Sequence, residues 1–347
     1  MTLKLSLPYL LQRRGMNLGY VSSDEPLAMP DIQTILTTWK NDEALVLPKL
    51  LEANLPHWHQ AIQHALACME NTLNGIELGE TLEKNGAMKR LESRFSFLAS
   101  SMEDHDEQAI EKLYFDAGDE KNILAEDLWC KASWLSFHDE DASLRFRFSF
   151  GMEGFEDVAA DPKRQHWAGE LCTSMFPESE LITTNPSILK YLTAILNHEP
   201  AFVERIVYFN APNGGAQFHH DVERGHAGVV FAQLSGATFW LAASKPLLMQ
   251  AICDFSQEND LKDELQNLLK EPQALSDYME EADHSLVEEL IDQNPKFIAY
   301  MIEQGFAHVL HTGDVLLLPQ RDLDHCVWHS VFTLGDEPGE ALSFAVR

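Results

Sequence analysis

Residues 213–221 have the sequence NGGAQFHHD, in which a glycine turn leads into a short strand pattern that ends in His-x-Asp. Side chains alternate along a strand, so His219 and Asp221 are predicted to project to one side while His220 points to the other. Local geometry therefore nearly preassembles two groups that can bind a metal ion. A His-x-Asp triplet is a weak signal on its own, because it occurs by chance in many sequences.

Strand-like segments flank this stretch on both sides. Residues 205–210 precede it, and residues 228–242 follow it with a bend at Ser235-Gly236. After a long helical interval, strand patterns return at 308–310, 314–318, 327–334 and 341–346. Together with an upstream hairpin, these make about eight or nine strands, a number typical of a jelly-roll or cupin-type sandwich.

The hairpin is predicted from SWLSF at 133–137 and LRFRFSF at 144–150, which flank the turn-rich HDEDA at 138–142. Its second strand alternates strictly between polar residues and phenylalanines, so one face should be apolar. A helix should begin at Asn185-Pro186, because proline suits the first helical turn and an apolar stripe follows.

The pattern from about residue 31 to 113 is helical, so residues 1–128 are predicted to form a helical N-terminal region. Residues 129–347 should form the catalytic β domain, interrupted by a helical and strongly acidic insertion at about 247–304. The predicted fold class is mainly β with α additions. We expect a double-stranded β-helix (jelly roll or cupin) with a helical N-terminal region and a helical insertion.

Composition narrows the choice of partners and compartment. The 347 residues are 45% hydrophobic, enough for a full core, and carry 25 Lys plus Arg against 55 Asp plus Glu, a net charge of -30. Such charge repels nucleic acids and anionic membranes, so neither is predicted as a partner. Five scattered cysteines without zinc-type spacing favour the reducing cytoplasm. The short apolar N-terminal stretch predicts no signal peptide, and no segment predicts a membrane helix.

A third metal ligand is predicted near the C-terminal end of the chain. GDVLLLP at 313–319 predicts a strand and its end, and WHSV at 328–331 begins another strand. His329 is preferred because it lies in an apolar strand, while His325 is the alternative and His226 and His311 are weaker rivals. Two histidines and a carboxylate on one face of iron form a facial triad, which leaves three adjacent coordination positions open. Zinc or manganese would accept the same ligands.

The order of these segments resembles the JmjC and cupin-like Fe(II)- and 2-oxoglutarate-dependent oxygenases. The matching elements are His-x-Asp, FAQLSG leading into FWL, GD-x-L-x-x-P, Trp-His and the closing LSFAVR, within roughly residues 200–347 apart from the insertion. The resemblance implies Fe(II) bound by His219, Asp221 and His329 as metal ligands and catalytic residues. It also implies 2-oxoglutarate and O₂ as cosubstrates, and hydroxylation of a protein side chain or small metabolite. In the family the gap between the proline and the last ligand is usually shorter, which favours His325.

The residue that would anchor 2-oxoglutarate departs from the family pattern. Many members place Lys or Arg where this chain has Thr238, and others place Arg where it has Ala341. A buried carboxylate needs a charge or several donors. The remaining basic candidates lie on predicted strands, with Arg347 leading because it shares a strand face with Ser343. The full set of candidates is Arg347, Arg145, Arg147 and Arg205, with Tyr208 and Thr238 as hydroxyl partners.

Other functions fit the same ligands. The main alternative is a metal-binding cupin without oxygenase activity, acting as a sensor, binding protein or interaction module, because both familiar basic anchors are missing. A metal-dependent isomerase or hydrolase is a third possibility. The acidic insertion is predicted either as a lid over the metal or as a solvated or homodimer face. A lid would favour a cationic small-molecule or peptide substrate.

Overall fold

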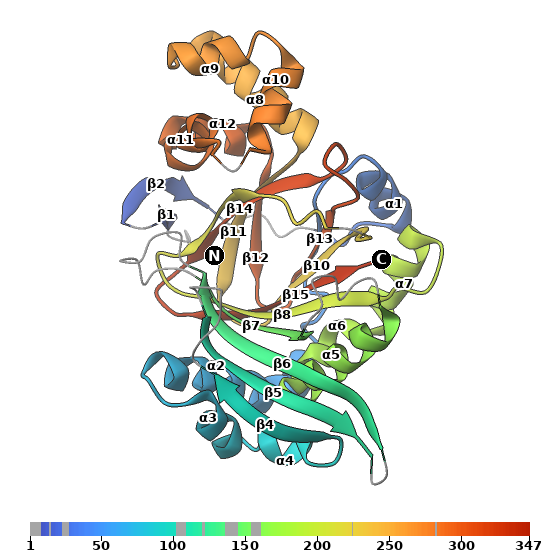
Figure 1. Cartoon of the computed structure of the whole chain (residues 1–347). Coiled ribbons are helices and arrows are strands. Elements are labelled where there is room, and N and C mark those ends of the chain that lie inside the picture. The colour runs from blue at the N-terminus through green and yellow to red at the C-terminus, as the bar shows by residue number, and fades with distance from the viewer. Residues whose placement is uncertain are drawn as a thin grey trace, which may run out of the picture.

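The computed structural model describes residues 8–13, 15–22, 28–101, 109–119, 122–135, 145–153, 161–223, 225–281 and 283–347. The architecture is mainly β with helical additions, as predicted (Figure 1). It contains a nine-stranded sheet, a four-stranded sheet and a two-stranded hairpin. None of the helices in these ranges has the length and apolar character that a membrane crossing requires.

Every strand pairs antiparallel with its neighbours. The hairpin pairs β1 (Tyr9–Arg13) with β2 (Met16–Val21). The large sheet has the order β3 (Leu45–Leu47), β13 (Val315–Pro319), β10 (Gly228–Gln233), β15 (Gly339–Val346), β8 (Phe202–Asn210), β7 (Arg145–Met152), β6 (Ile123–Leu135), β5 (Ala109–Gly118) and β4 (Phe95–Ser101). The small sheet has the order β12 (Ala307–His311), β11 (Ala237–Ser244), β14 (Val327–Leu334) and β9 (Gly215–His219).

The helices form two groups. One group packs on the large sheet and comprises α1 (Ile32–Lys40), α2 (Leu55–Leu73), α3 (Leu78–Lys84), α4 (Ala87–Leu91), α5 (Pro162–Met175), α6 (Glu180–Thr183) and α7 (Pro186–Leu196), with the 3₁₀ helix Pro177–Ser179 between α5 and α6. The other group packs on the small sheet and comprises α8 (Lys245–Glu258), α9 (Asp263–Leu268), α10 (Pro272–Met279), α11 (Ser285–Gln293) and α12 (Pro295–Glu303).

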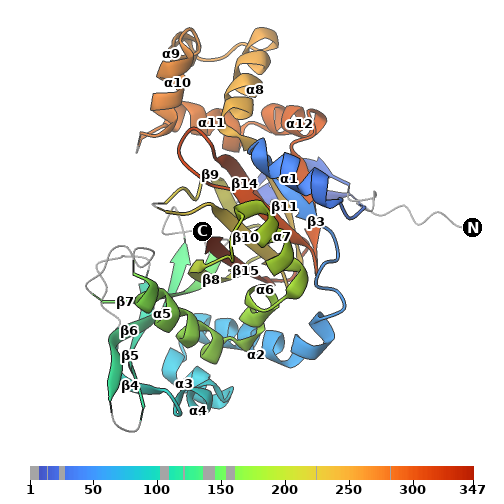
Figure 2. The same cartoon turned by 90° about the vertical axis from the view of Figure 1, so that its right-hand side faces the viewer.

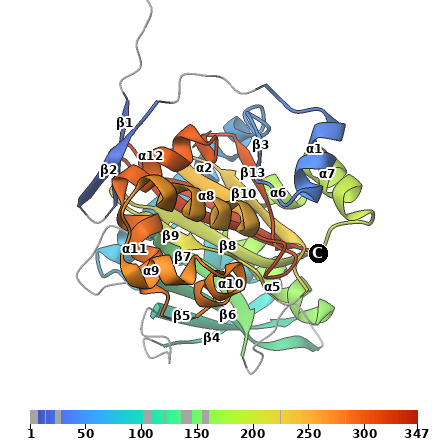
Figure 3. The same ribbon diagram turned by 90° about the horizontal axis from the view of Figure 1, so that it is seen from above.

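The sheets lie between α8–α12 at one end and α2–α4 at the other, with α1 and α7 alongside the sheets (Figures 1 and 2). The two sheets face each other across a core that includes Phe231 and Leu316 of the large sheet and Trp240 and Val331 of the small sheet. Viewed from above, α8–α12 overlie the sheets (Figure 3). The small sheet and the facing part of the large sheet thus bury both faces, which explains why these strands are rich in apolar residues, whereas β4 is mostly exposed.

The prediction of a helical region at residues 1–128 is wrong near its start, where β1 and β2 lie, and in its last third. β4 and β5 occupy residues 95–101 and 109–118, and β6 begins at Ile123, so the boundary predicted between 128 and 129 falls inside β6. In β5, Leu113, Phe115 and Ala117 are buried against the helices while the residues between them face the other way. Buried side chains in β5 therefore recur at every second residue, which is typical of a strand. The prediction rested on helical spacing and missed this alternation.

Several other predicted elements are confirmed. β6 and β7 pair as the expected hairpin, with Trp134 opposite Phe146, while its turn at 136–144 lies outside the described residues. α7 begins at Pro186, and the Asn185 side chain caps it by accepting from the Ser187 backbone N–H at 3.0 Å. The insertion predicted at 247–304 is the group α8–α12, which spans Lys245 to Glu303.

Two carboxyl groups are buried side by side under the outer face of the large sheet. Glu178 of the 3₁₀ helix and Glu340 of β15 are 1% and 0% exposed. Burial raises the pKa of Glu178 to about 7 and raises the pKa of Glu340 well above its ordinary value. The folded chain therefore holds protons here that the unfolded chain releases above about pH 4.5.

Replacing Glu340 with Gln should stabilise the protein at pH 8 and leave its stability almost unchanged near pH 4.5. Burial raises the folded-state pKa of Glu340, so its protonated form gives stability that is fully present below about pH 4.5 and is lost as the pH rises toward that raised pKa. Urea unfolding between pH 4.5 and 8 measures this loss, with the exposed Glu337→Gln as control. Parallel stability curves for Glu340→Gln and the unmodified chain would contradict the assignment.

Candidate metal centre

Three potential metal ligands meet at the end of the small sheet. His219 is the last residue of β9, and His329 lies directly opposite it on β14. Asp221 follows two residues after His219, beyond the end of the strand rather than within it as the sequence predicted. Ligand atoms of the three residues lie within 4.8 Å of one another, a grouping shown by no other set of His, Cys, Asp or Glu in the described part of the chain.

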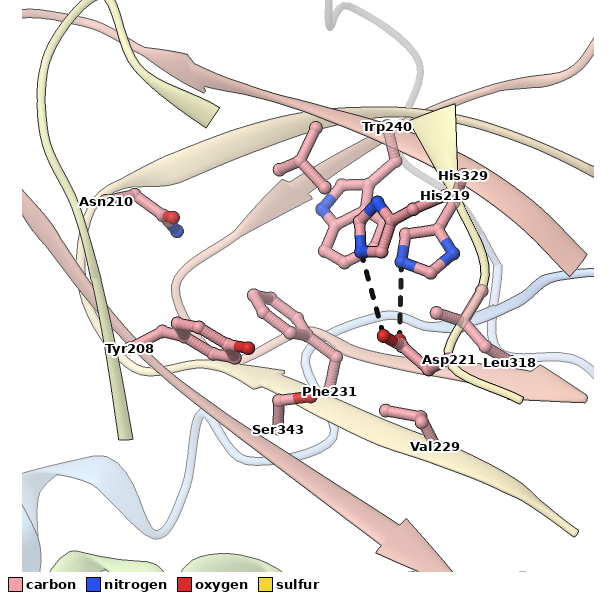
Figure 4. A pocket seen from close by; sticks show the side chains of 11 residues that line it. Tyr208, Asn210, His219, Asp221, Val229, Phe231, Trp240, Leu318, His329 and Ser343 are labelled. Atoms are coloured by element: carbon pink, nitrogen blue, oxygen red, sulfur yellow. Dashed lines mark ion pairs between the residues drawn. The ribbon is translucent and has the colours of Figure 1, made fainter. Parts of the chain in front are cut away.

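The three side chains converge on one point (Figure 4). The Nε2 atom of His219 lies 3.7 Å from Oδ1 of Asp221, and Nε2 of His329 lies 3.5 Å from Oδ2. The two imidazole centroids are 4.3 Å apart. Metal bonds of about 2.0–2.2 Å hold neighbouring ligand atoms roughly 3 Å apart, so a small inward shift would complete the coordination.

The tautomers of both histidines suit a metal. Nδ1 of His219 lies 2.7 Å from the Gln217 carbonyl oxygen, and Nδ1 of His329 lies 3.2 Å from the Val327 carbonyl oxygen. A carbonyl only accepts, so each Nδ1 carries the proton and donates it. Each ring therefore turns Nε2 rather than Nδ1 toward Asp221, and in the neutral tautomer that atom offers its lone pair to a metal.

The backbone also brings the two strands together closely. Gly215 begins β9 with φ +136°, a region that residues with a side chain rarely adopt. A Cβ atom at Gly215 would lie 1.9 Å from the Val331 carbonyl oxygen on β14. The glycine of the motif thus permits the close approach that sets His219 opposite His329.

The pocket beside these ligands is narrow and lies between the two sheets. The space open to the centre of a water molecule is ≈ 20 Å³, which holds about one or two waters. The indole of Trp240 stacks on the His329 ring, with centroids 5.3 Å apart. The pocket is lined by Tyr208, Asn210, His219, Asp221, Val229, Phe231, Trp240, Leu318, His329, Val331 and Ser343. This described lining includes no lysine or arginine.

The alternative third ligand, His325, lies elsewhere. Its side chain is 55% exposed, and its Nδ1 atom is 2.8 Å from Oδ1 of Asp322 in the loop before β14. The other two rivals, His226 and His311, also lie outside the converging group. The structure therefore brings His329 rather than His325 to His219 and Asp221.

The predicted cosubstrate residues are dispersed. Tyr208 lines the pocket. Thr238 does not, because its hydroxyl is buried, donates to Gln233 at 2.9 Å and accepts from the indole N–H of Trp240 at 2.9 Å. Arg347 reaches Gln165 on α5, at 3.4 Å, instead of the pocket. The structure thus corrects the predicted roles of Thr238 and Arg347.

The other three candidate arginines differ in where they lie relative to the pocket. Arg205 points to the opposite side of the large sheet, where it donates to the Gly169 carbonyl oxygen at 2.9 Å. Arg145 begins β7, but its side chain lies outside the described part of the chain. Arg147 is opposite Tyr208 in the β7–β8 register, so the two side chains share the face of the sheet that lines the pocket.

The rim of the site carries charges of both signs. Burial, together with the nearby carboxylates of Glu223 and Asp221, raises the pKa of Glu204 to about 7. The Arg147 guanidinium acts to lower the pKa of Glu204. Glu204 is therefore close to both Asp221 and Arg147.

Asn210 and Trp240 are two of the pocket residues that sequence reasoning missed. Asn210 lies two positions after Tyr208 on β8, and Trp240 lies two positions after Thr238 on β11. The alternation of side chains along a strand could have found Asn210 from Tyr208. Nothing in the sequence indicates that the Trp240 indole, rather than the Thr238 hydroxyl, occupies the pocket.

Comparison with known proteins gives distant structural likeness. The sequence matches no protein-family model and no curated protein. Among solved structures, the chain is similar to a 2OG-Fe(II) oxygenase family oxidoreductase from Burkholderia pseudomallei, with 8% identity, 93% coverage of both chains and a TM-score of 0.34. It is also similar to the ribosomal oxygenase YcfD from Escherichia coli, with 13% identity and a TM-score of 0.26.

The match covers 76% of this chain and 43% of YcfD, so this chain spans less than half the length of that protein. A second YcfD structure, in complex with cobalt and succinic acid, matches with 14% identity and a TM-score of 0.25. These structural neighbours are oxygenases, the class that the sequence motifs resemble. At TM-scores this low the likeness supports no assignment, which has to come from the chain's own residues.

Proposed function

We propose that this chain is an Fe(II)-dependent oxygenase that uses 2-oxoglutarate and O₂ to hydroxylate a protein side chain or a small metabolite. The observation that supports the proposal is the group of His219, Asp221 and His329, whose imidazoles direct their two Nε2 atoms at one carboxylate. Structural zinc sites close with four protein ligands. Three ligands on one side leave open positions of the kind that oxygen chemistry requires.

We also propose that β8–β15 form a double-stranded β-helix. Four of these strands form one half, in the order β13-β10-β15-β8, and the other four form the facing half, in the order β12-β11-β14-β9. From β8 to β11 the chain passes from one sheet to the other at each connection, and it does so again from β12 to β15. This alternation supports the assignment.

Iron bound at this centre would activate O₂, and one oxygen atom would pass to the substrate while the other converts 2-oxoglutarate to succinate and CO₂. The chain's own residues would bind the metal, orient the bound acid and shield the site from water. His219, Asp221 and His329 would hold the metal, and the apolar walls formed by Val229, Phe231 and Leu318 would exclude water. Tyr208, Asn210 and Ser343 would offer hydroxyl and amide groups to a bound acid.

Arg147 takes the place of Arg347 as the proposed basic anchor for 2-oxoglutarate. It shares a sheet face with Tyr208 and influences Glu204, which lies near Asp221. Its Nε lies 3.3 Å from the Ser133 hydroxyl, so the guanidinium is held on that face. An arginine can pair with a carboxylate through two parallel hydrogen bonds.

The second candidate function is a metal-binding cupin without oxygenase activity. The small cavity, ≈ 20 Å³, and a described lining without lysine or arginine favour it. For 2-oxoglutarate to reach the metal, the Trp240 indole would have to move or the ligand would have to enter from the open side. Both functions share the metal centre and differ in the cosubstrate.

Titration of the Fe(II) protein with 2-oxoglutarate under anaerobic conditions should produce a visible metal-to-ligand absorption band. Arg147→Ala should weaken 2-oxoglutarate binding ten- to a hundred-fold, because losing a charge-assisted pair costs about 1.5–3 kcal/mol. The exposed Arg94→Ala is the matched control, since Arg94 pairs with Glu170 at the surface. Absence of both the band and O₂-dependent succinate formation in protein that holds iron would favour the second candidate.

A further inference from the structure

The strand that ends in His219, two residues before Asp221, is an edge strand. β9 ends the order of the small sheet, with β14 as its one neighbour there. Their register joins three residue pairs and contains an irregularity between His329 and Val331. Edge strands with few ladder bonds shift easily, whereas metal ligands must be held to within about 0.5 Å. Something besides the sheet has to hold β9 in place.

The helical insertion supplies contacts along the outer side of this strand. The Phe218 backbone N–H donates to both carboxylate oxygens of Asp292 on α11, at 2.9 and 3.1 Å. The Gln217 side-chain amide donates to Glu288 on the same helix. Phe218 belongs to the apolar core formed with the insertion, and His219 faces the pocket. The insertion therefore holds β9 on the side of the strand that faces away from the pocket.

Glu280, which follows α10, binds His220, the residue between His219 and Asp221. His220 Nδ1 accepts from the Val222 backbone N–H at 3.2 Å, so its Nε2 carries the proton and donates to Glu280 at 2.9 Å. The other Glu280 oxygen accepts from the buried Lys245 ammonium at 2.6 Å. The His220 ring also lies edge-on to Trp328, which precedes His329, at 5.1 Å.

Asp292 also ties the two ligand strands to each other. It is buried and pairs with Arg13 Nη1 at 2.7 Å. Arg13 donates in turn to the Val331 carbonyl oxygen at 3.2 Å and to the Ser330 hydroxyl, both on β14. The Ser330 hydroxyl donates to the Ala216 carbonyl oxygen of β9 at 3.1 Å. The network thus joins β9 to β14 beside the His219–His329 pair, on the side of Ala216 and Val331.

We propose that the helical insertion is the positioning element of the metal centre, with Glu280, Glu288 and Asp292 as positioning residues that hold His219 and Asp221 in ligating register. This role rests on the metal site of the proposed function. It also assigns a specific role to three of the acidic residues in the insertion. The described lining of the pocket contains no residue of α8–α12, so this role replaces that of a lid.

Co(II) titration of the metal-free chain, followed through the visible spectrum of the bound ion, tests the proposal. Glu280→Ala should weaken Co(II) binding about ten-fold, the low end of the effect of removing a partner from a metal ligand itself, because Glu280 bonds His220, which lies between the two ligands. Glu280→Gln keeps an oxygen acceptor and should recover most of the affinity. The control is Glu289→Gln on α11, since Glu289 is exposed and pairs with Lys262 within the insertion.

A second measurement separates positioning from a general loss of stability. Hydrogen exchange of the metal-free chain should become faster at residues 215–222 in Glu280→Ala, while β10 and β15 keep their protection. In a His220→Phe background, Glu280→Ala should change Co(II) affinity less than two-fold, because the two residues act as one contact. Faster exchange throughout the chain, or additive effects of the two substitutions, would overturn the positioning role.

The outcomes also distinguish the two proposals. An unmodified chain that binds no Co(II) at micromolar concentration would overturn the proposed function and the inference resting on it. An unmodified chain that binds Co(II) as tightly as its Glu280→Ala variant would leave the proposed function standing and overturn the positioning role alone.

Discussion

Replacing His329 with alanine should abolish stoichiometric iron binding, whereas His325→Ala should leave it intact. The His329 side chain is 3% exposed and directs Nε2 to Asp221 at 3.5 Å, so its loss removes one of three protein ligands. His219→Ala and Asp221→Ala should have the same effect for the same reason. Metal analysis of each variant, after anaerobic loading with Fe(II) and removal of free metal, measures the change from one ion per chain to nearly none.

His325→Ala is the matched control, because His325 is also a histidine near β14 but its ring is bound to Asp322. Circular dichroism should show an unchanged fold in all four variants. Loss of iron in His325→Ala together with retention in His329→Ala would transfer the third position to His325. Full iron content in His219→Ala or Asp221→Ala would contradict the metal centre itself.

Replacing Arg13 with alanine should lower the free energy of unfolding by about 3–5 kcal/mol, the usual cost of breaking a buried ion pair from one side. Arg13 and Asp292 are both 2% exposed, so the variant leaves a buried carboxylate without its cation. It also removes a guanidinium that lies 4.0 Å from the centre of the Phe332 ring. Chemical denaturation at pH 7 measures the loss.

Two comparisons make this result specific. Arg94→Ala breaks a surface pair with Glu170 and should cost less than about 1 kcal/mol. The cost of Arg13→Ala should also shrink as the pH falls, because burial already raises the pKa of Asp292 and a protonated Asp292 needs no cation. A loss near that of Arg94→Ala at every pH would contradict the importance assigned to this pair.

Much of the metal group could be predicted because its signals are local. The alternation of His219, His220 and Asp221 follows from strand geometry, and the apolar context of His329 placed it on a strand. The structure has the three residues close together. The exact end of β9 at His219 was missed, since strand ends depend on pairing with β14, which a single segment does not encode.

Other features of the fold and the site could not be predicted, because they depend on contacts between residues far apart in the sequence. The phenylalanine-rich strand β7 was predicted from its alternation, whereas β4 and β5 were hidden by a search for helical spacing. The acidic character of α8–α12 was plain, but the contacts of Glu280 and Asp292 with β9 are long-range and leave no local pattern. The position of Arg347 failed as a prediction because the shared strand face with Ser343 does not continue past the end of β15.

The wide separation in sequence of the strands that meet at the metal centre has a consequence for folding. Ser330 on β14 bonds to Ala216 on β9 across 114 positions, and Arg13 pairs with Asp292 across 279. Contacts that close such long loops form late, after the local hairpins and helices. During synthesis, Arg13 emerges long before its partner exists, and the three ligands can meet only after β14 has been made. On the proposed function, metal capture is therefore expected to be among the last steps of maturation, so that a chain able to bind iron would already have completed its fold.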